Sequence, residues 1–165
     1  MSKSNEVATM VMSSPVGMLR LTASARGVKS IEVIKGSRVA NATVPRNGAG
    51  AIVRQAEKEL REYFSGRRQK FTVKLDLDGT EFQRTAWEAM RRIPFGSTIS
   101  YGDQAKAIGK PKAFRAVGSA NGRNPVPIIV PCHRVLASDG SLGGYSLGLS
   151  MKRRLLALEG VSVAG

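Results

Sequence analysis

Residues 99–135 read ISYGDQAKAIGKPKAFRAVGSANGRNPVPIIVPCHRV, and this stretch decides the fold of the second half of the chain. Ser100 can cap a short helix that ends at Gly109. A second helix is expected over residues 111–120, with Pro111 in its first turn. Two short helices joined by a glycine-containing turn are typical of a helix-turn-helix, although proteins that do not bind DNA also contain such pairs.

The stretch ends with the only cysteine and the only histidine of the 165-residue chain. Residues 128–130 form an apolar run that predicts a buried strand, and Pro131 makes the chain turn directly after it. A thiol beside an imidazole suggests nucleophilic chemistry, in which His133 accepts the proton of Cys132. Adjacent side chains point in different directions, so direct contact is not expected. The alternative is that the cysteine is a small buried hydrophobe.

The segment that follows contains a turn and a last helix. Asp139 and Gly140 are typical of a hairpin turn. The last helix is expected to be capped by Ser150 and to end at Gly160. Glu159 lies in its last turn, where the helix dipole disfavours a carboxylate. Such a carboxylate is either solvated or present to orient a nearby imidazole, as in a nucleophile–base–carboxylate relay.

A further helix is expected before this stretch. Thr80 and Gln83 form a capping box, and the helix should end before Pro94. Its core-facing residues are expected to be Phe82, Ala86, Trp87 and Met90.

The first half of the chain alternates between strand and helix patterns. Residues 7–34 contain short apolar runs separated by turn residues and predict an antiparallel meander. Residues 36–50 are rich in small and turn-forming residues and predict a loop or linker. Apolar residues at helical spacing predict a helix over residues 51–64, stopped by Gly66, and residues 71–77 alternate as a strand.

These patterns together predict an α+β protein of two domains. The first, residues 1–78, is a small antiparallel sheet with one helix and includes the 36–50 loop. The second, residues 79–165, is mainly helical and carries a winged helix-turn-helix-like motif.

The composition is strongly basic. The chain has 26 Lys and Arg residues against 12 Asp and Glu, a formal net charge of +14. An excess of this size favours polyanionic partners, nucleic acid first and acidic membrane surfaces second. Residues 1–78 carry 14 basic and 7 acidic residues, and residues 79–165 carry 12 and 5. The two halves therefore have equal net charge, and charge does not locate the partner.

Several classes of protein are disfavoured. One cysteine excludes an intrachain disulfide, a CxxC redox pair and a thiolate zinc cluster, so we expect no metal. No apolar run approaches the roughly 18 residues of a membrane span. The first ten residues lack the continuous apolar segment of a secretory signal, so we expect a cytoplasmic protein.

Several blocks together resemble the O6-alkylguanine-DNA alkyltransferase family, in that family's order and spacing. The blocks are ISYGDQA (99–105), RAVGSANGRNP (115–125), PCHRV (131–135), GYS (144–146) and LLALEG (155–160). The N-terminal half resembles the family only in layout. The resemblance implies transfer of the alkyl group from O6-alkylguanine in DNA, and also from O4-alkylthymine, to the protein's own cysteine. It implies no cofactor and one transfer per molecule.

The resemblance also implies roles for the residues described above. Cys132 is similar to the alkyl acceptor, His133 to its general base acting through a bound water, and Glu159 to the carboxylate that fixes the imidazole. Asn124 is similar to the residue that braces the turn before the active site. Tyr101 is similar to the tyrosine that hydrogen-bonds the flipped guanine and helps it leave as a neutral base.

DNA and pocket contacts follow from the same resemblance. Arg115 is similar to the finger inserted where the flipped nucleotide had been. The expected DNA contacts are Tyr101, Lys112, Arg115, Ala116 and Asn121. The expected substrate pocket is Tyr101, Val135, Tyr145 and Ser146. Leu147 replaces a glycine found in several relatives and is expected to narrow that pocket. The partner is duplex DNA bound through the minor groove by a monomer, with cooperative assembly on DNA as a further expectation.

Two other classes of function remain open from the residues alone. One is a helix-turn-helix regulator or lesion sensor without chemistry, in which Tyr101 and Arg115 are ordinary helix residues and Asn124 only a turn residue. The other is a thiol hydrolase that uses Cys132, His133 and Glu159, for which the adjacency of thiol and imidazole is a poor direct geometry.

Overall fold

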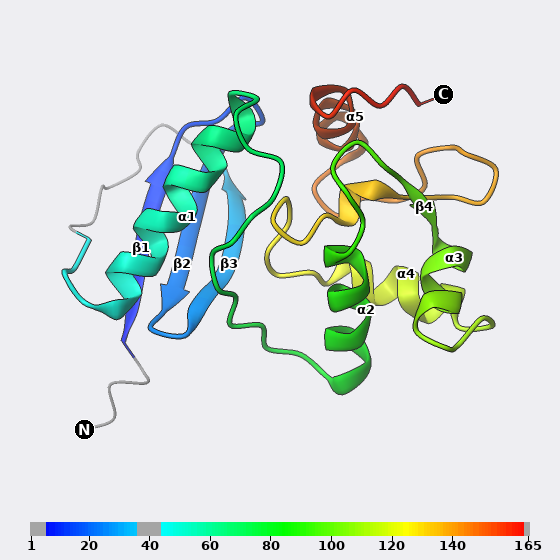
Figure 1. The fold of residues 1–165 in the computed structure, drawn as a ribbon, viewed down its shortest axis with the longest axis horizontal. Helices are drawn as coiled ribbons and strands as arrows, with labels where there is room; N and C mark the ends of the chain where they lie inside the picture. The colour runs from blue at the N-terminus through cyan, green and yellow to red at the C-terminus, as the bar shows by residue number, and fades with distance from the viewer. Residues whose placement is uncertain (1–5, 36–43, 164–165) are drawn as a thin grey trace. The chain divides into compact units, whose positions relative to one another are not determined.

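The computed structural model describes residues 6–35 and 44–163 (Figure 1). The chain divides into two compact units, Met1–Asp78 and Gly79–Gly165. The first contains a sheet and a helix and the second is mainly helical. The predicted α+β class is therefore confirmed.

The first unit is built on a three-stranded antiparallel sheet in the order β1-β2-β3. Its elements are β1 (Val7–Met12), β2 (Met18–Ser24), β3 (Gly27–Ile34) and the helix α1 (Gly48–Phe64). This is the meander that the sequence predicts. Alternate residues of the central strand, Leu19, Leu21 and Ala23, are fully buried. The helix lies across the sheet in Figure 1 and contacts all three strands.

The start of α1 differs from the prediction. The side chain of Asn47 accepts a hydrogen bond from the Gly50 amide at 2.8 Å and caps the helix. Because the cap lies at residue 47, the last three residues of the predicted 36–50 loop are helical. Residues 36–43 of that loop lie outside the described residues.

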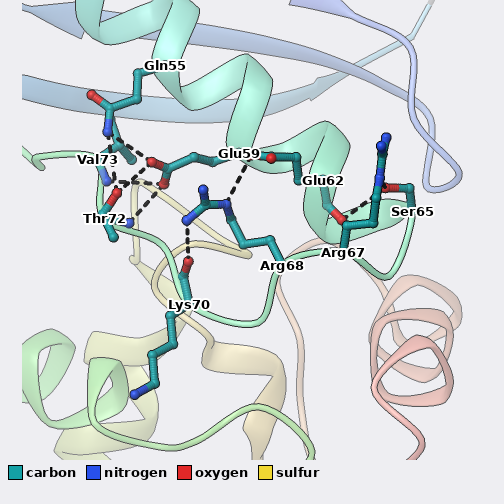
Figure 2. A network of polar contacts seen from close by, with 9 residues as sticks. All are labelled: Gln55, Glu59, Glu62, Ser65, Arg67, Arg68, Lys70, Thr72 and Val73. Carbon is teal, nitrogen blue, oxygen red and sulfur yellow. Dashed lines mark hydrogen bonds and ion pairs between the residues drawn. The ribbon is translucent and has the colours of Figure 1, made fainter.

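The strand predicted over residues 71–77 is wrong, because side-chain hydrogen bonds replace most of its ladder. Leu75 forms only an isolated bridge with Val28. Thr72 and Val73 instead donate their backbone N–H groups to Glu59 of α1, at 2.8 and 3.1 Å (Figure 2).

The Glu59 side chain fastens this segment to the helix. The residue is 2% exposed, and its carboxylate also accepts from the Thr72 hydroxyl at 2.7 Å and from Gln55 at 2.9 Å (Figure 2). Burial raises the pKa of Glu59, but the hydrogen bonds from Gln55, Thr72 and Val73 outweigh it and hold the pKa below its usual range. The ionised form is therefore the one that the fold stabilises.

The second unit begins with the predicted capping box. Thr80 and Gln83 exchange hydrogen bonds at the start of α2 (Glu81–Arg91). Of the four residues expected to face the core, Ala86, Trp87 and Met90 are buried and Phe82 is half-buried. The Trp87 indole donates to the Ala120 carbonyl at 2.8 Å and so ties α2 to α4 (Phe114–Gly122).

The helix-turn-helix pair consists of α3 (Tyr101–Ala107) and α4. A reciprocal amide pair joins the two helices: Gln104 donates to Asn121 at 3.0 Å and Asn121 donates back at 2.7 Å. The second helix begins later than predicted. The Ala113 amide donates to the Lys110 carbonyl at 2.9 Å, so Pro111 lies in a turn before the helix.

The strand predicted over residues 128–130 is also wrong. Pro127 and Val130 form one isolated bridge, and Ile128 has a φ of 76°, which is strained for a β-branched residue. One backbone hydrogen bond lies within this buried loop, from the Val130 amide to the Val126 carbonyl at 2.9 Å. The apolar run reflects burial and not a ladder.

Two short strands that the sequence did not reveal form a parallel pair, β4 (Ile99–Ser100) and β5 (Val135–Leu136). The turn at Asp139 and Gly140 exists, since the Gly140 amide donates to the Ala137 carbonyl at 3.0 Å. It closes a loop, however, and does not join two antiparallel strands.

The last helix, α5 (Leu149–Leu158), begins before its predicted cap. Gly148 with a φ of 98° occupies the cap position in place of Ser150, and Glu159 follows the last helical residue.

The Glu59 network makes the stability of the first unit depend on pH. Its stabilising contribution is present above the pKa that Glu59 has in the unfolded chain, and is lost as the pH falls through the lower folded pKa. We expect Glu59→Gln to reduce the free energy of unfolding by about 2 kcal/mol at neutral pH, because an amide N–H would face a donor. The same substitution should make the free energy of unfolding depend less on pH in the acid range.

Denaturant unfolding across the acid range measures both effects. Glu57→Gln on the same helix is the control, since the one partner of Glu57 among the described residues is Arg61, whose side chain is 53% exposed. Equal losses in the two variants would contradict a special role for Glu59.

Candidate active site

Cys132 begins a single 3-10 turn, Cys132–Arg134, directly after Pro131. Its side chain is nearly buried, with 7% of the residue exposed. The thiol lies in the wall of a pocket, whose lining residues are Tyr101, Gly118, Asn121, Gly122, Cys132, Gly144, Tyr145 and Ser146. The pocket therefore combines the helix-turn-helix pair with the loop that precedes α5.

Asn124 holds the loop that leads to the thiol. Its amide donates to the Val130 carbonyl at 2.8 Å and to the Cys132 Sγ at 3.3 Å, while its carbonyl accepts from the Val126 amide at 2.9 Å. One side chain thus closes both ends of the loop and contacts the sulfur. A donor at the sulfur favours the thiolate over the thiol.

The resting state of Cys132 is nevertheless the thiol. Burial raises its pKa, and the contributions of Asn124, Lys152 and Tyr145 only partly offset this. A protonated thiol is a weak nucleophile, so the site needs a base.

His133 and Glu159 form a fully buried pair. The distance from His133 Nε2 to the Glu159 Oε2 is 2.6 Å, and both side chains are 0% exposed. Because a carboxylate can only accept, the proton of the neutral imidazole is assigned to Nε2. Nδ1 then carries the lone pair, and it is a buried atom with no hydrogen-bond partner among the described residues.

The imidazole is held in its neutral form. Burial lowers the pKa of His133, the contact with Glu159 raises it, and the charges of Arg134 and Lys152 lower it, with a net downward shift. A neutral imidazole with a free Nδ1 lone pair can accept a proton. The structure thus brings together the thiol, the imidazole and the carboxylate that the sequence singled out.

Tyr101, the first residue of α3, closes the other side of the pocket. Its hydroxyl donates to the Gly144 carbonyl at 3.4 Å. Gly143 has a φ of 67°, and a Cβ there would lie 3.1 Å from the tyrosine ring, so the close approach needs glycine. Burial, followed by the negative charge that Cys132 carries when it is ionised, raises the pKa of Tyr101, which keeps its hydroxyl protonated as a donor.

The residues expected to contact DNA fall into two groups. Lys112, Arg115 and Ala116 are exposed around the start of α4. Asn121 is 5% exposed; it lines the pocket, but its amide group is paired with Gln104.

The expected pocket residues are also divided. Tyr145 and Ser146 line the pocket together with Tyr101. Val135 does not: it is fully buried in β5. Leu147 is half-buried and does not line the pocket either.

Two buried cations of the site were missed. Arg134 donates from Nε and Nη2 to the Glu159 carboxylate, at 2.8 and 3.0 Å. Lys152 donates to three backbone carbonyls of the segment between β5 and the pocket, those of Val135, Leu142 and Gly144. In the sequence Lys152 stands in a run of three basic residues, which is typical of a solvated face. The one feature of the sequence that could have predicted the burial of Lys152 is the distribution of charged and apolar residues over the faces of α5.

The two units match the two domains of one known family. Residues 7–77 match the ribonuclease-like domain of 6-O-methylguanine DNA methyltransferases, and residues 81–161 match the DNA-binding domain of the same proteins. The chain belongs to this family.

Curated members of the family are similar over nearly their whole length. The methylated-DNA–protein-cysteine methyltransferase of Methanosarcina acetivorans is 45% identical over 150 residues, which are 91% of this chain and 96% of that one. The protein of the same name from Mycobacterium tuberculosis is 44% identical over 150 residues, 88% of each chain.

Solved structures of the methyltransferase family agree with the fold. The crystal structure of the Mycobacterium tuberculosis O6-methylguanine methyltransferase has a TM-score of 0.79 at 42% identity and covers 93% of each chain. A crystal structure of Mycobacterium tuberculosis OGT in complex with DNA has a TM-score of 0.79 at 43% identity, over 92% of this chain and 91% of that one.

The described part of this methyltransferase contains neither a metal-binding cluster nor a helix that could span a membrane. Within residues 6–35 and 44–163, no group of three or more His, Cys, Asp or Glu side chains is placed to hold a metal ion. None of the described helices has the length and apolar character needed to cross a membrane.

Lys152 should stabilise the pocket segment. Burial lowers its pKa to about 8, so the amine is still protonated at neutral pH. We expect Lys152→Met to lower the free energy of unfolding by about 3 kcal/mol, because buried carbonyls would lose their donor. Denaturant unfolding measures the loss, and Lys106→Met at an exposed position of α3 is the control. A loss no larger than in the control would contradict this role.

Proposed function

We propose that this protein repairs O6-alkylguanine in duplex DNA by moving the alkyl group onto Cys132. The observation that carries the proposal is the position of the thiol, which lines a pocket and belongs to the same 3-10 turn as an imidazole bound to a carboxylate. The protein is a methylated-DNA–protein-cysteine methyltransferase, as are the curated relatives that cover it almost entirely. The product is a thioether, whose carbon–sulfur bond is not cleaved by exchange with another thiol, so each molecule acts once.

The base in this mechanism is His133, acting through a water molecule. The thiol is protonated at rest, so its proton must leave as the sulfur attacks. No hydrogen bond joins the two side chains in the described structure, but the Nδ1 of His133, which has no partner among the described residues, can accept the proton from a bridging water. Glu159 keeps the other ring nitrogen occupied and the ring oriented.

The transfer itself is a displacement at the alkyl carbon. The bond from Sγ to carbon forms while the bond from carbon to the guanine O6 breaks, and the electron pair of that bond goes to the guanine. Tyr101 lines the pocket as a protonated donor, so it can supply the proton that lets guanine leave as a neutral base. Asn124 stabilises the developing thiolate through its contact with the sulfur.

The protein binds DNA, and we assign the contact to the helix-turn-helix. The target atom lies inside the duplex, so the nucleotide must be flipped out into the pocket. Arg115 is exposed on α4, where it can fill the gap that the flipped nucleotide leaves, and Lys112 and Ala116 lie close to it in the chain. Docking in the minor groove suits this arrangement, with phosphate contacts that weaken as salt increases. Asn121 would contact the nucleotide only from the pocket side.

The finer properties belong to the same proposal. The protein acts as a monomer inside the cell, with cooperative assembly on long DNA, and accepts O4-alkylthymine as a second substrate.

Mass analysis of the modified protein tests the assignment of the acceptor. Incubation with a duplex that contains one O6-methylguanine should add one methyl group to the Cys132 peptide and remove one lesion per protein molecule. Cys132→Ala should bind the same duplex and leave the lesion intact. An unmodified Cys132 with a persisting lesion would point to a sensor, and repeated turnover on an ester or amide would point to a hydrolase.

The role of Arg115 is tested by comparing two substrates. We expect Arg115→Ala to slow transfer from the duplex by about tenfold or more, because the gap left by the flipped nucleotide is no longer filled. Transfer from the free O6-methylguanine base should keep its rate, since no flipping is needed. Arg123→Ala, at an exposed position just after α4, is the control. Equal losses on both substrates would contradict the assignment.

A further inference from the structure

Arg134 is a buried cation that the transfer mechanism leaves without a part. Its side chain is 7% exposed and lies in the same 3-10 turn as Cys132 and His133. Besides its two hydrogen bonds to Glu159, it donates from Nη1 to the Ile93 carbonyl at 2.7 Å. Its Cζ lies 5.9 Å from the centre of the Phe95 ring. The guanidinium is therefore held rigidly in one orientation.

The Glu159 carboxylate is shared between Arg134 and His133. Oε1 accepts from Arg134 at 2.8 Å and from the Gly96 amide at 3.2 Å, and Oε2 accepts from Arg134 at 3.0 Å and lies 2.6 Å from the His133 ring. A guanidinium is charged at every accessible pH, so it neutralises one carboxylate by itself. With that charge already balanced, a second cation on the imidazole would be left uncompensated in a buried site.

Removing the guanidinium would reverse this preference. A buried carboxylate whose nearest charged partner is an imidazole favours protonation of that imidazole, which yields a paired imidazolium and carboxylate. An imidazolium has no lone pair and cannot accept a proton from the bridging water. The groups that face His133 are Glu159, Arg134 and Lys152, and the last two both oppose its protonation.

We propose that Arg134 is a positioning residue that balances the charge of Glu159, so that His133 stays neutral and available as the base for Cys132. This inference rests on the proposed function for the role of the base. It extends that function by naming the group that sets the protonation state of the base. Arg134 itself does not touch the alkyl group or the sulfur.

The ionisation of His133 can be measured directly, because it is the only histidine in the chain. Nuclear magnetic resonance of protein labelled at both ring nitrogens of histidine gives one set of signals, which report tautomer and charge. From about pH 6 to about pH 8 the unmodified protein should show the neutral form with the proton on Nε2. In Arg134→Met the signals of His133 should be those of the imidazolium. In Arg134→Lys, which keeps the positive charge at position 134, the imidazole should stay neutral.

A double variant tests the charge balance itself. Arg134→Met combined with Glu159→Gln removes both charges, so the imidazole should return to the neutral form. Should Arg134→Met fail to fold, Arg134→Gln makes the same measurement, because it can still donate a hydrogen bond to the carboxylate but carries no charge. If His133 is neutral in folded Arg134→Met, or in folded Arg134→Gln, the proposal is overturned.

Single-turnover transfer rates provide the second measurement. Arg134→Met should lose activity at neutral pH, by about tenfold for each pH unit by which the pKa of His133 exceeds the assay pH, and recover as the pH rises. A loss that is the same at every pH would indicate a purely structural role and overturn the inference. If the unmodified protein does not methylate Cys132, the proposed function fails, while the resonance measurement still decides the charge-balancing role.

Discussion

The active site of this protein depends on one buried carboxylate, that of Glu159. A charge without access to water is tolerated only when it is paired and fully hydrogen-bonded, and here the donors come from two separate segments. The residues that surround it, His133, Arg134 and Gly96, belong to the 3-10 turn and to the turn after α2. These segments must meet at the end of α5 for the charge to be compensated. The orientation of the imidazole, and with it the chemistry of the neighbouring thiol, follows from that requirement.

Much of the architecture could be predicted from local chemistry. The meander, the helices and the capping box at Thr80 are set by hydrophobic periodicity and by short-range hydrogen bonds, both of which are visible in the sequence. The family was identifiable from the blocks around Cys132, and the comparisons confirm it. The contact between the imidazole of His133 and the carboxylate of Glu159 agrees with the relay hypothesis, in which the unfavourable position of Glu159 relative to the helix dipole is a signal of its role.

The errors have a common physical origin, because long-range side-chain contacts replaced regular structure or concealed charges. Residues 71–77 alternate like a strand, but Glu59 binds their backbone and leaves only one bridge. Residues 128–130 are apolar like a strand, but the Val130 amide donates within the loop to the Val126 carbonyl, and Asn124 binds the Val130 carbonyl. Lys152 reads as a surface cation because nothing in its neighbours shows that three carbonyls will surround it. Contacts of this kind are determined only when the whole domain is folded.

The long sequence separation of the carboxylate and its donors constrains when the site can exist. Gly96 and Glu159 are 63 residues apart, and His133 and Glu159 are 26 apart. The entropy cost of closing loops of this length must be met before such non-local contacts stabilise the chain, so we expect them to form after the local helices. On the ribosome, Cys132 and His133 are synthesised before α5, and the imidazole has no carboxylate to orient it during that interval. In the proposed mechanism the nascent chain therefore carries an unassisted thiol, and competence for transfer begins only after the last helix has emerged.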